Sequence, residues 1–149
     1  MRDPGTLATV ASIIAGFGSA MLAFRLEREV TAGDEGERMW IAWADWLIIA
    51  ATVVSLALGL LPIISGVVPD PPQSALASAA TSASVVLTIG YVPAILAHYR
   101  LILGRHRRGR RANPEPSEQW LTLVFAGLAL VTFILLLTTL LSHPPTKPT

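Results

Sequence analysis

The sequence predicts an all-α integral membrane protein, a bundle of four transmembrane helices. Hydrophobic residues make up 52% of the 149 residues and charged residues only 14%, whereas a soluble domain carries roughly 25% charged residues. The charges also leave four uninterrupted uncharged windows, at residues 4–24, 47–68, 71–97 and 119–142. Each window exceeds the ~18 residues that separate a membrane span from a buried soluble helix.

We therefore expect one membrane domain over residues 1–149, with two loops on one side of the membrane. The predicted spans lie at about 6–24, 47–68, 74–98 and 119–141, and the two loops at about 25–46 and 99–118. The first window is interpreted as a span and not as a cleaved signal peptide, because its apolar run is longer than that of a signal peptide and Arg25 and Arg28 follow it.

The distribution of positive charge predicts the orientation of the spans. Of the 11 Lys and Arg residues, those in the two loops are Arg25, Arg28, Arg38, Arg100, Arg105, Arg107, Arg108, Arg110 and Arg111. The opposite side holds only Arg2 and Lys147. Positive residues in short loops stay in the cytoplasm, so both termini are predicted to be extracytoplasmic in a multi-pass protein of the plasma (inner) membrane.

The segment "RHRRGRR" directly follows the third span, at the depth of lipid headgroups. Its arginines are expected to set topology and to contact anionic lipids, with docking of a cytoplasmic protein as an alternative; they are Arg105, Arg107, Arg108, Arg110 and Arg111. The interleaved aromatic residues of single-stranded nucleic acid binders are missing, so no nucleic acid partner is expected. Downstream, Ser117 is predicted to be a helix N-cap, with Glu118 in the favourable first turn.

Span one carries small residues at a spacing of four, which places each set on one helix face. One set is Ala8, Ser12, Gly16 and Ala20, and a second is Ala11, Ala15, Ser19 and Ala23. Small side chains let a neighbouring helix approach closely, either within the bundle or at a subunit interface. Span two has a comparable helix-packing set, Ala51, Ser55 and Gly59.

Between these spans, Trp40, Trp43 and Trp46 recur every three residues and predict an interfacial lead-in to span two. Arg25 and Glu29 are spaced to form a pair on the preceding helical segment. Asp45 lies among the tryptophans and is interpreted as a rim carboxylate, hydrated or paired with an arginine. A role in handling ions or protons is the alternative.

Span three presents one continuous hydroxyl face, made of Ser74, Ser78, Thr81, Ser84 and Thr88. These hydroxyls either pack against helices or, together with Asp45, line a hydrated conduction path. Gly90 and Pro93 lie within one turn, where the helix can kink. Span four is rich in leucine and is predicted to face lipid.

No catalytic, metal or cofactor motif is present, cysteine is absent, and the three histidines lie on both sides of the membrane. We therefore expect a non-enzymatic protein without a cofactor. It would be a membrane-embedded assembly or interaction subunit, either a homo-oligomer or a partner of other membrane subunits, with the small-residue faces of spans one and two as its partner surface. The alternative is a homo-oligomeric ion channel or small-solute transporter with a path along the hydroxyls of span three.

Overall fold

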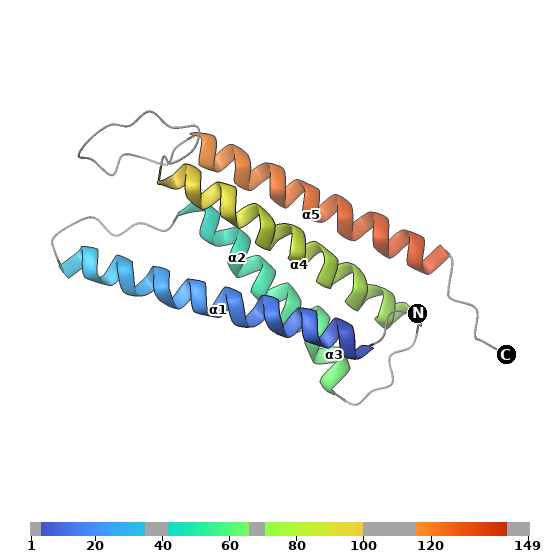
Figure 1. The fold of residues 1–149 in the computed structure, drawn as a ribbon. Helices are drawn as coiled ribbons and strands as arrows, with labels where there is room; N and C mark the ends of the chain where they lie inside the picture. The colour runs from blue at the N-terminus through green and yellow to red at the C-terminus, as the bar shows by residue number, and fades with distance from the viewer. Residues whose placement is uncertain (1–3, 35–41, 66–70, 100–115, 143–149) are drawn as a thin grey trace.

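The computed structural model describes residues 4–34, 42–65, 71–99 and 116–142, which form an antiparallel helical bundle (Figure 1). Its elements are α1 (Pro4–Asp34), α2 (Trp43–Val54), the π-helix η1 (Ser55–Leu60), α3 (Leu61–Ile64), α4 (Pro71–His98) and α5 (Pro116–Ser142). Four stretches are long and apolar enough to cross a membrane: Gly5–Thr31, Trp43–Ile64, Gln73–His98 and Pro116–Ser142. The expected all-helical class with four candidate spans is confirmed at this level.

The first two helices extend beyond the windows that the charges delimit. Helix α1 runs to Asp34 although its apolar window ends at residue 24, because Arg25 is buried and neutralised within the bundle. Helix α2 begins at Trp43, where the Asp45 carboxylate accepts a hydrogen bond from the Ala42 N–H and caps the helix. Trp43 and Trp46 are therefore part of the second long helix itself.

The second span changes to a π-helix over Ser55–Leu60, immediately before Pro62. Proline has no N–H, and its ring clashes with the carbonyl of the residue four positions earlier in an α-helix. The wider π-turn relieves this conflict, and the Leu61 N–H donates to the Leu56 carbonyl, five residues back. The span therefore stays helical through the proline.

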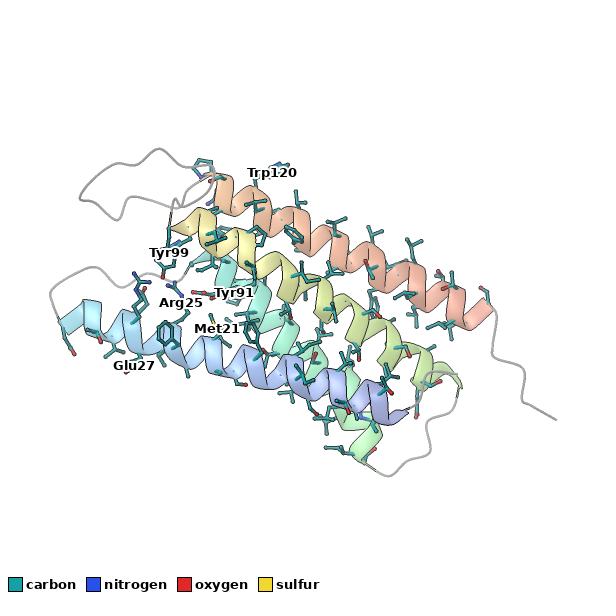
Figure 2. All side chains as sticks on the ribbon, in the orientation of Figure 1. Met21, Arg25, Glu27, Tyr91, Tyr99 and Trp120 are labelled. Atoms are coloured by element: carbon teal, nitrogen blue, oxygen red, sulfur yellow. The ribbon has the colours of Figure 1, made fainter. Side chains whose placement is uncertain are left out.

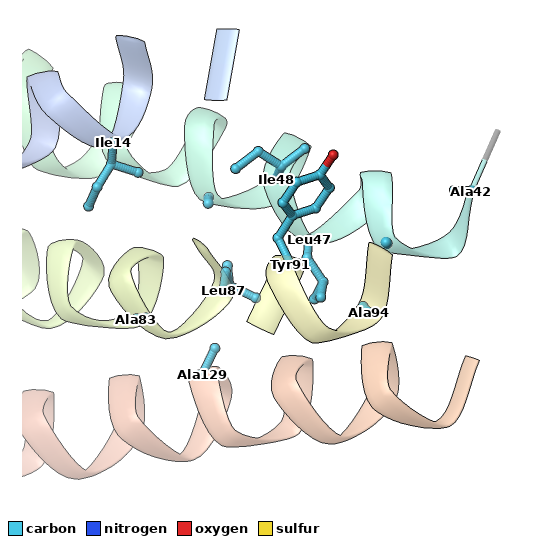
Figure 3. Packing of buried hydrophobic residues seen from close by; sticks show 11 residues of the cluster. Ile14, Ala42, Leu47, Ile48, Ala83, Leu87, Tyr91, Ala94 and Ala129 are labelled. Atoms are coloured by element: carbon cyan, nitrogen blue, oxygen red, sulfur yellow. The ribbon is translucent and has the colours of Figure 1, made fainter. Parts of the chain in front are cut away.

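Helix α4 is the central helix of the bundle, with 50% of its most apolar window buried, against 11% for α5. Leu47 and Ile48 of α2 pack against Leu87 and Tyr91 of α4 in the hydrophobic core (Figure 3). Pro93, where the sequence allows a kink, lies inside α4, and the helix continues to His98.

Glycines allow the closest helix approaches. A Cβ added to Gly59 would lie 3.0 Å from the Thr81 hydroxyl and 3.2 Å from the Ala11 Cβ, so α1, η1 and α4 meet there. A Cβ added to Gly90 would overlap the side chain of Phe125, so α4 and α5 are close together at that level. Gly90 thus serves helix packing.

Candidate functional site: a polar cluster at one end of the bundle

Polar side chains from all four long helices meet at one end of the bundle. The antiparallel order brings the ends of α1 and α4 together with the starts of α2 and α5 (Figure 1). The residues are Arg25, Asp45, His98, Tyr99 and Glu118, which we call the polar cluster. Arg25 and Tyr99 approach each other across the space between α1 and α4 (Figure 2).

Arg25 and Asp45 form a bidentate ion pair between α1 and α2. The Arg25 Nε lies 3.2 Å from the Asp45 Oδ1, and its Nη2 lies 3.2 Å from Oδ2. Arg25 is 5% exposed and Asp45 6%. The predicted partner Glu29 lies farther away, with its Oε1 3.9 Å from the Arg25 Nη2. The pairing of Asp45 with an arginine, one of the two forms expected for a rim carboxylate, is therefore present.

Tyr99 closes the cluster over the guanidinium groups of α1. The Arg25 Nη1 donates a hydrogen bond to the Tyr99 hydroxyl. The Arg28 Cζ lies 4.5 Å from the centroid of the Tyr99 ring, a cation–π geometry. The His98 ring meets the Tyr99 ring edge-on, with 5.0 Å between centroids. Tyr99 is thereby fixed from both sides.

Glu118 joins α5 to both α2 and α4 and is fully buried. Its Oε2 lies 2.9 Å from the His98 Nδ1, and its Oε1 accepts a hydrogen bond of 3.0 Å from the Ala44 N–H. Asp45 and Glu118 thus satisfy two of the backbone donors that the first turn of α2 leaves free, and their charge complements the positive end of its dipole.

The chemistry of the polar cluster is that of a helix-joining network. Each carboxylate is paired with a basic side chain and with a backbone N–H. Within the described residues, no group of three or more His, Asp and Glu side chains could hold a metal ion. Replacing a buried ion pair by apolar residues is often close to neutral, so these pairs are by themselves weak evidence of added stability.

The small residues of the first two spans fall on different surfaces. Ala51, Ser55 and Gly59 are buried inside the bundle, so they are not available to a partner. Ser12, Gly16 and Ala20 are exposed, while Ala8 is partly buried. The inner packing face of α1 is instead formed by Ala11, Ala15 and Gly18.

The hydroxyl face of α4 is turned into the protein. Ser78, Thr81 and Ser84 are buried, and Ser74 and Thr88 are partly buried. The hydroxyls of Thr81, Ser84 and Thr88 each donate to the carbonyl four residues earlier, at 2.8, 2.9 and 2.8 Å. These three donors are occupied by their own helix, as is usual for hydroxyls in membrane helices.

Some predicted features lie outside the described residues, one prediction is wrong, and one contact of the polar cluster was not predicted. The five arginines of residues 105–111 lie outside the described residues, as does Trp40. Ser117 is not an N-cap, because Pro116 already belongs to α5. The contact between His98 and Glu118 was not predicted. Both residues directly flank uncharged windows, and both lie on the same predicted side of the membrane.

No protein-family model, curated protein or solved structure matches this chain. The described residues by themselves show an all-helical bundle with four candidate membrane-spanning helices, compatible with a multi-pass membrane protein.

Proposed function

We propose that this chain is a small, non-enzymatic, multi-pass subunit of the plasma (inner) membrane. It acts by packing against other membrane helices, those of further copies of itself or of another membrane subunit. Its arginine-rich loop lies in the cytoplasm against anionic lipids, and both termini are extracytoplasmic.

The outer face of α1 is the observation that carries this proposal. Ser12, Gly16, Ser19 and Ala23 recur at steps of four, three and four residues, and all four are exposed. An added Cβ at Gly16 would meet nothing within 4 Å, whereas one at Gly18 would overlap Thr52. Gly18 therefore packs against Thr52 inside the bundle, and Gly16 lies on the outer face of α1.

Small residues at membrane-exposed positions favour helix association in lipid. There, van der Waals contact between closely approaching backbones drives packing, because lipid is as apolar as the side chains. Since Ala51, Ser55 and Gly59 are already used inside the chain, the proposed partner surface is confined to α1.

Tryptophans support the proposed placement of the polar cluster near a membrane surface. Trp43, Trp46 and Trp120 are 40%, 58% and 63% exposed, and all belong to helix starts at the end of the bundle that holds the cluster. Exposed tryptophan favours the headgroup level. The nine arginines of the two loops support the cytoplasm as the adjoining compartment.

A channel or small-solute transporter lined by α4 is the second candidate. Four hydroxyls are buried without a hydrogen-bond partner among the described residues, and water molecules in the bundle would satisfy them; they belong to Ser55, Tyr91, Ser117 and Thr122. The occupied hydroxyls of Thr81, Ser84 and Thr88 favour packing instead. The assembly role therefore has the stronger support.

The assembly role is tested by enlarging the outer face of α1. Gly16→Leu should convert an oligomer into a monomer, because the leucine holds the two backbones apart, and helix content should not change. Ala126→Leu is the matched control, since Ala126 is exposed on α5. Cross-linking and energy transfer between labelled chains in liposomes measure the association. A wild-type chain that is monomeric in liposomes, or equal losses in both variants, would contradict the proposal.

A further inference from the structure

A second exposed face of α1 carries bulky side chains and ends at an arginine. Phe17, Phe24 and Arg28 follow one another at seven and four residues, so they lie on one face of the helix. Phe17 is 43% exposed and Phe24 62%, and Arg28 is exposed as well. At 100° per residue this face is about a third of a turn from the small face at Gly16.

The Arg28 guanidinium lies over the Tyr99 ring, and among the described residues it forms no ion pair with a carboxylate. Its Cζ lies 4.5 Å from the Tyr99 ring centroid, and Tyr99 is fixed in turn by the hydrogen bond from Arg25. No ion pair of Arg28 with a carboxylate is formed among the described residues, and the neighbouring Glu29 is directed to Arg25. Stacking on the ring leaves the N–H edges of the guanidinium free, in the fork geometry that suits a phosphate.

The depth of Arg28 corresponds to the lipid headgroups. Arg25 pairs with Asp45 beside the exposed tryptophans Trp43 and Trp46, and Arg28 lies about 4.5 Å farther along the helix. From Arg28 back to Phe17 the helix rises about 16 Å. This distance is close to half of the ~30 Å hydrocarbon thickness, the depth of one leaflet.

We propose that this face of α1 binds one anionic phospholipid, with its phosphate on Arg28 and an acyl chain along Phe24 and Phe17. The aromatic side chains supply apolar contact over the depth of a leaflet, and the guanidinium supplies the complementary charge. This lipid site rests on one part of the proposed function, the insertion of the chain into a membrane. It does not require self-association. It does not require the proposed orientation either, because both leaflets have headgroups.

The test measures which lipid stays bound to the purified full-length chain in detergent. Equimolar phosphatidylglycerol and phosphatidylcholine are added, and bound lipid is counted by native mass spectrometry. All proteins carry the five arginines of residues 105–111 as glutamines, so that the loop does not contribute. Phosphatidylglycerol should exceed phosphatidylcholine by about fivefold, the effect of a single arginine at the headgroup level.

Arg28→Gln should remove this preference, and Arg38→Gln, which deletes the same charge from the same predicted loop, should leave it intact. Phe24→Ala should lower the retention of both lipids in parallel. Equal effects of Arg28→Gln and Arg38→Gln would overturn the proposal, because general charge would then explain the preference. Displacement of the lipid by millimolar glycerol phosphate would also overturn it and would indicate a site for free phosphate. Each lipid is counted on monomers and oligomers separately, so a failed assembly does not alter the result.

Discussion

Breaking the Arg25–Asp45 pair from one side should destabilise the bundle strongly. Asp45→Leu leaves a guanidinium that is 5% exposed without its bidentate carboxylate and removes the acceptor of the Ala42 N–H. Loss of one partner of a buried pair costs about 3–5 kcal/mol of the free energy of unfolding. Arg25→Met, which leaves the Asp45 carboxylate buried and unpaired, should cost a similar amount.

The double variant Arg25→Met/Asp45→Leu should be far more stable than the sum of the single changes predicts. Replacing both members of a buried pair by apolar residues is often close to neutral, and the loss of the donor to Tyr99 and of the helix cap adds about 2 kcal/mol. Against a sum of at least about 6 kcal/mol for the single changes, the coupling energy should be about 4 kcal/mol. Coupling of this size is expected only between residues in direct contact.

The unfolding free energies are measured by titrating dodecyl sulfate into dodecyl maltoside micelles and recording far-ultraviolet circular dichroism. Glu27→Gln serves as the control, because Glu27 is exposed, and should change the value by no more than about 0.5 kcal/mol. Additive single and double variants would refute the pairing. A cost below about 1 kcal/mol for Asp45→Leu would mean that water screens the pair.

Three further outcomes are expected. Gly90→Ala should cost about 1–3 kcal/mol in the same titration, because the new methyl group meets Phe125. Gly127→Ala, in open space on α5, should gain up to about 1 kcal/mol of helix propensity, and equal effects would contradict the packing of α4 on α5. Cysteines that replace the buried hydroxyls should resist a charged, membrane-impermeant thiol reagent, while a cysteine at exposed Ser65 should react; the buried positions are Ser78, Thr81 and Ser84. Labelling at those three positions would favour the channel. Reporter fusions at the C-terminus should read as extracytoplasmic and fusions within residues 109–114 as cytoplasmic, and the reverse pattern would invert the proposed orientation.

The four long helices could be predicted because a single property, the length of the uncharged windows, determines them. The ends of the helices could not. Arg25 closes the first uncharged window in the sequence, but its charge is neutralised by Asp45, so the helix continues unchanged. For Asp45 the sequence indicates a rim carboxylate that is either hydrated or paired with an arginine, and it does not identify the arginine. Nine arginines in the loops leave that choice open.

The rotation of each helix about its axis is harder to predict from the sequence than its position along the chain. Helices that are apolar on every side have no polar face to mark solvent, so the two small-residue sets of span one were equivalent in sequence. The pairing of Arg25 with Asp45 distinguishes the two sets, because it turns the Arg25 face of the helix into the bundle. Gly18 and Ala11 precede Arg25 at intervals of seven residues and therefore share this buried face. The His98–Glu118 contact depends in the same way on two helix rotations at once.

The position of Glu118 has a consequence for the order in which the chain is made. Its two partners, Ala44 and His98, precede it by 74 and 20 residues, so both are synthesised and inserted before it. Until α5 is synthesised, the Ala44 N–H in the first turn of α2 and the ring of His98 lack the carboxylate that Glu118 provides. Packing of α5 against α2 and α4 is therefore the step that completes the polar cluster.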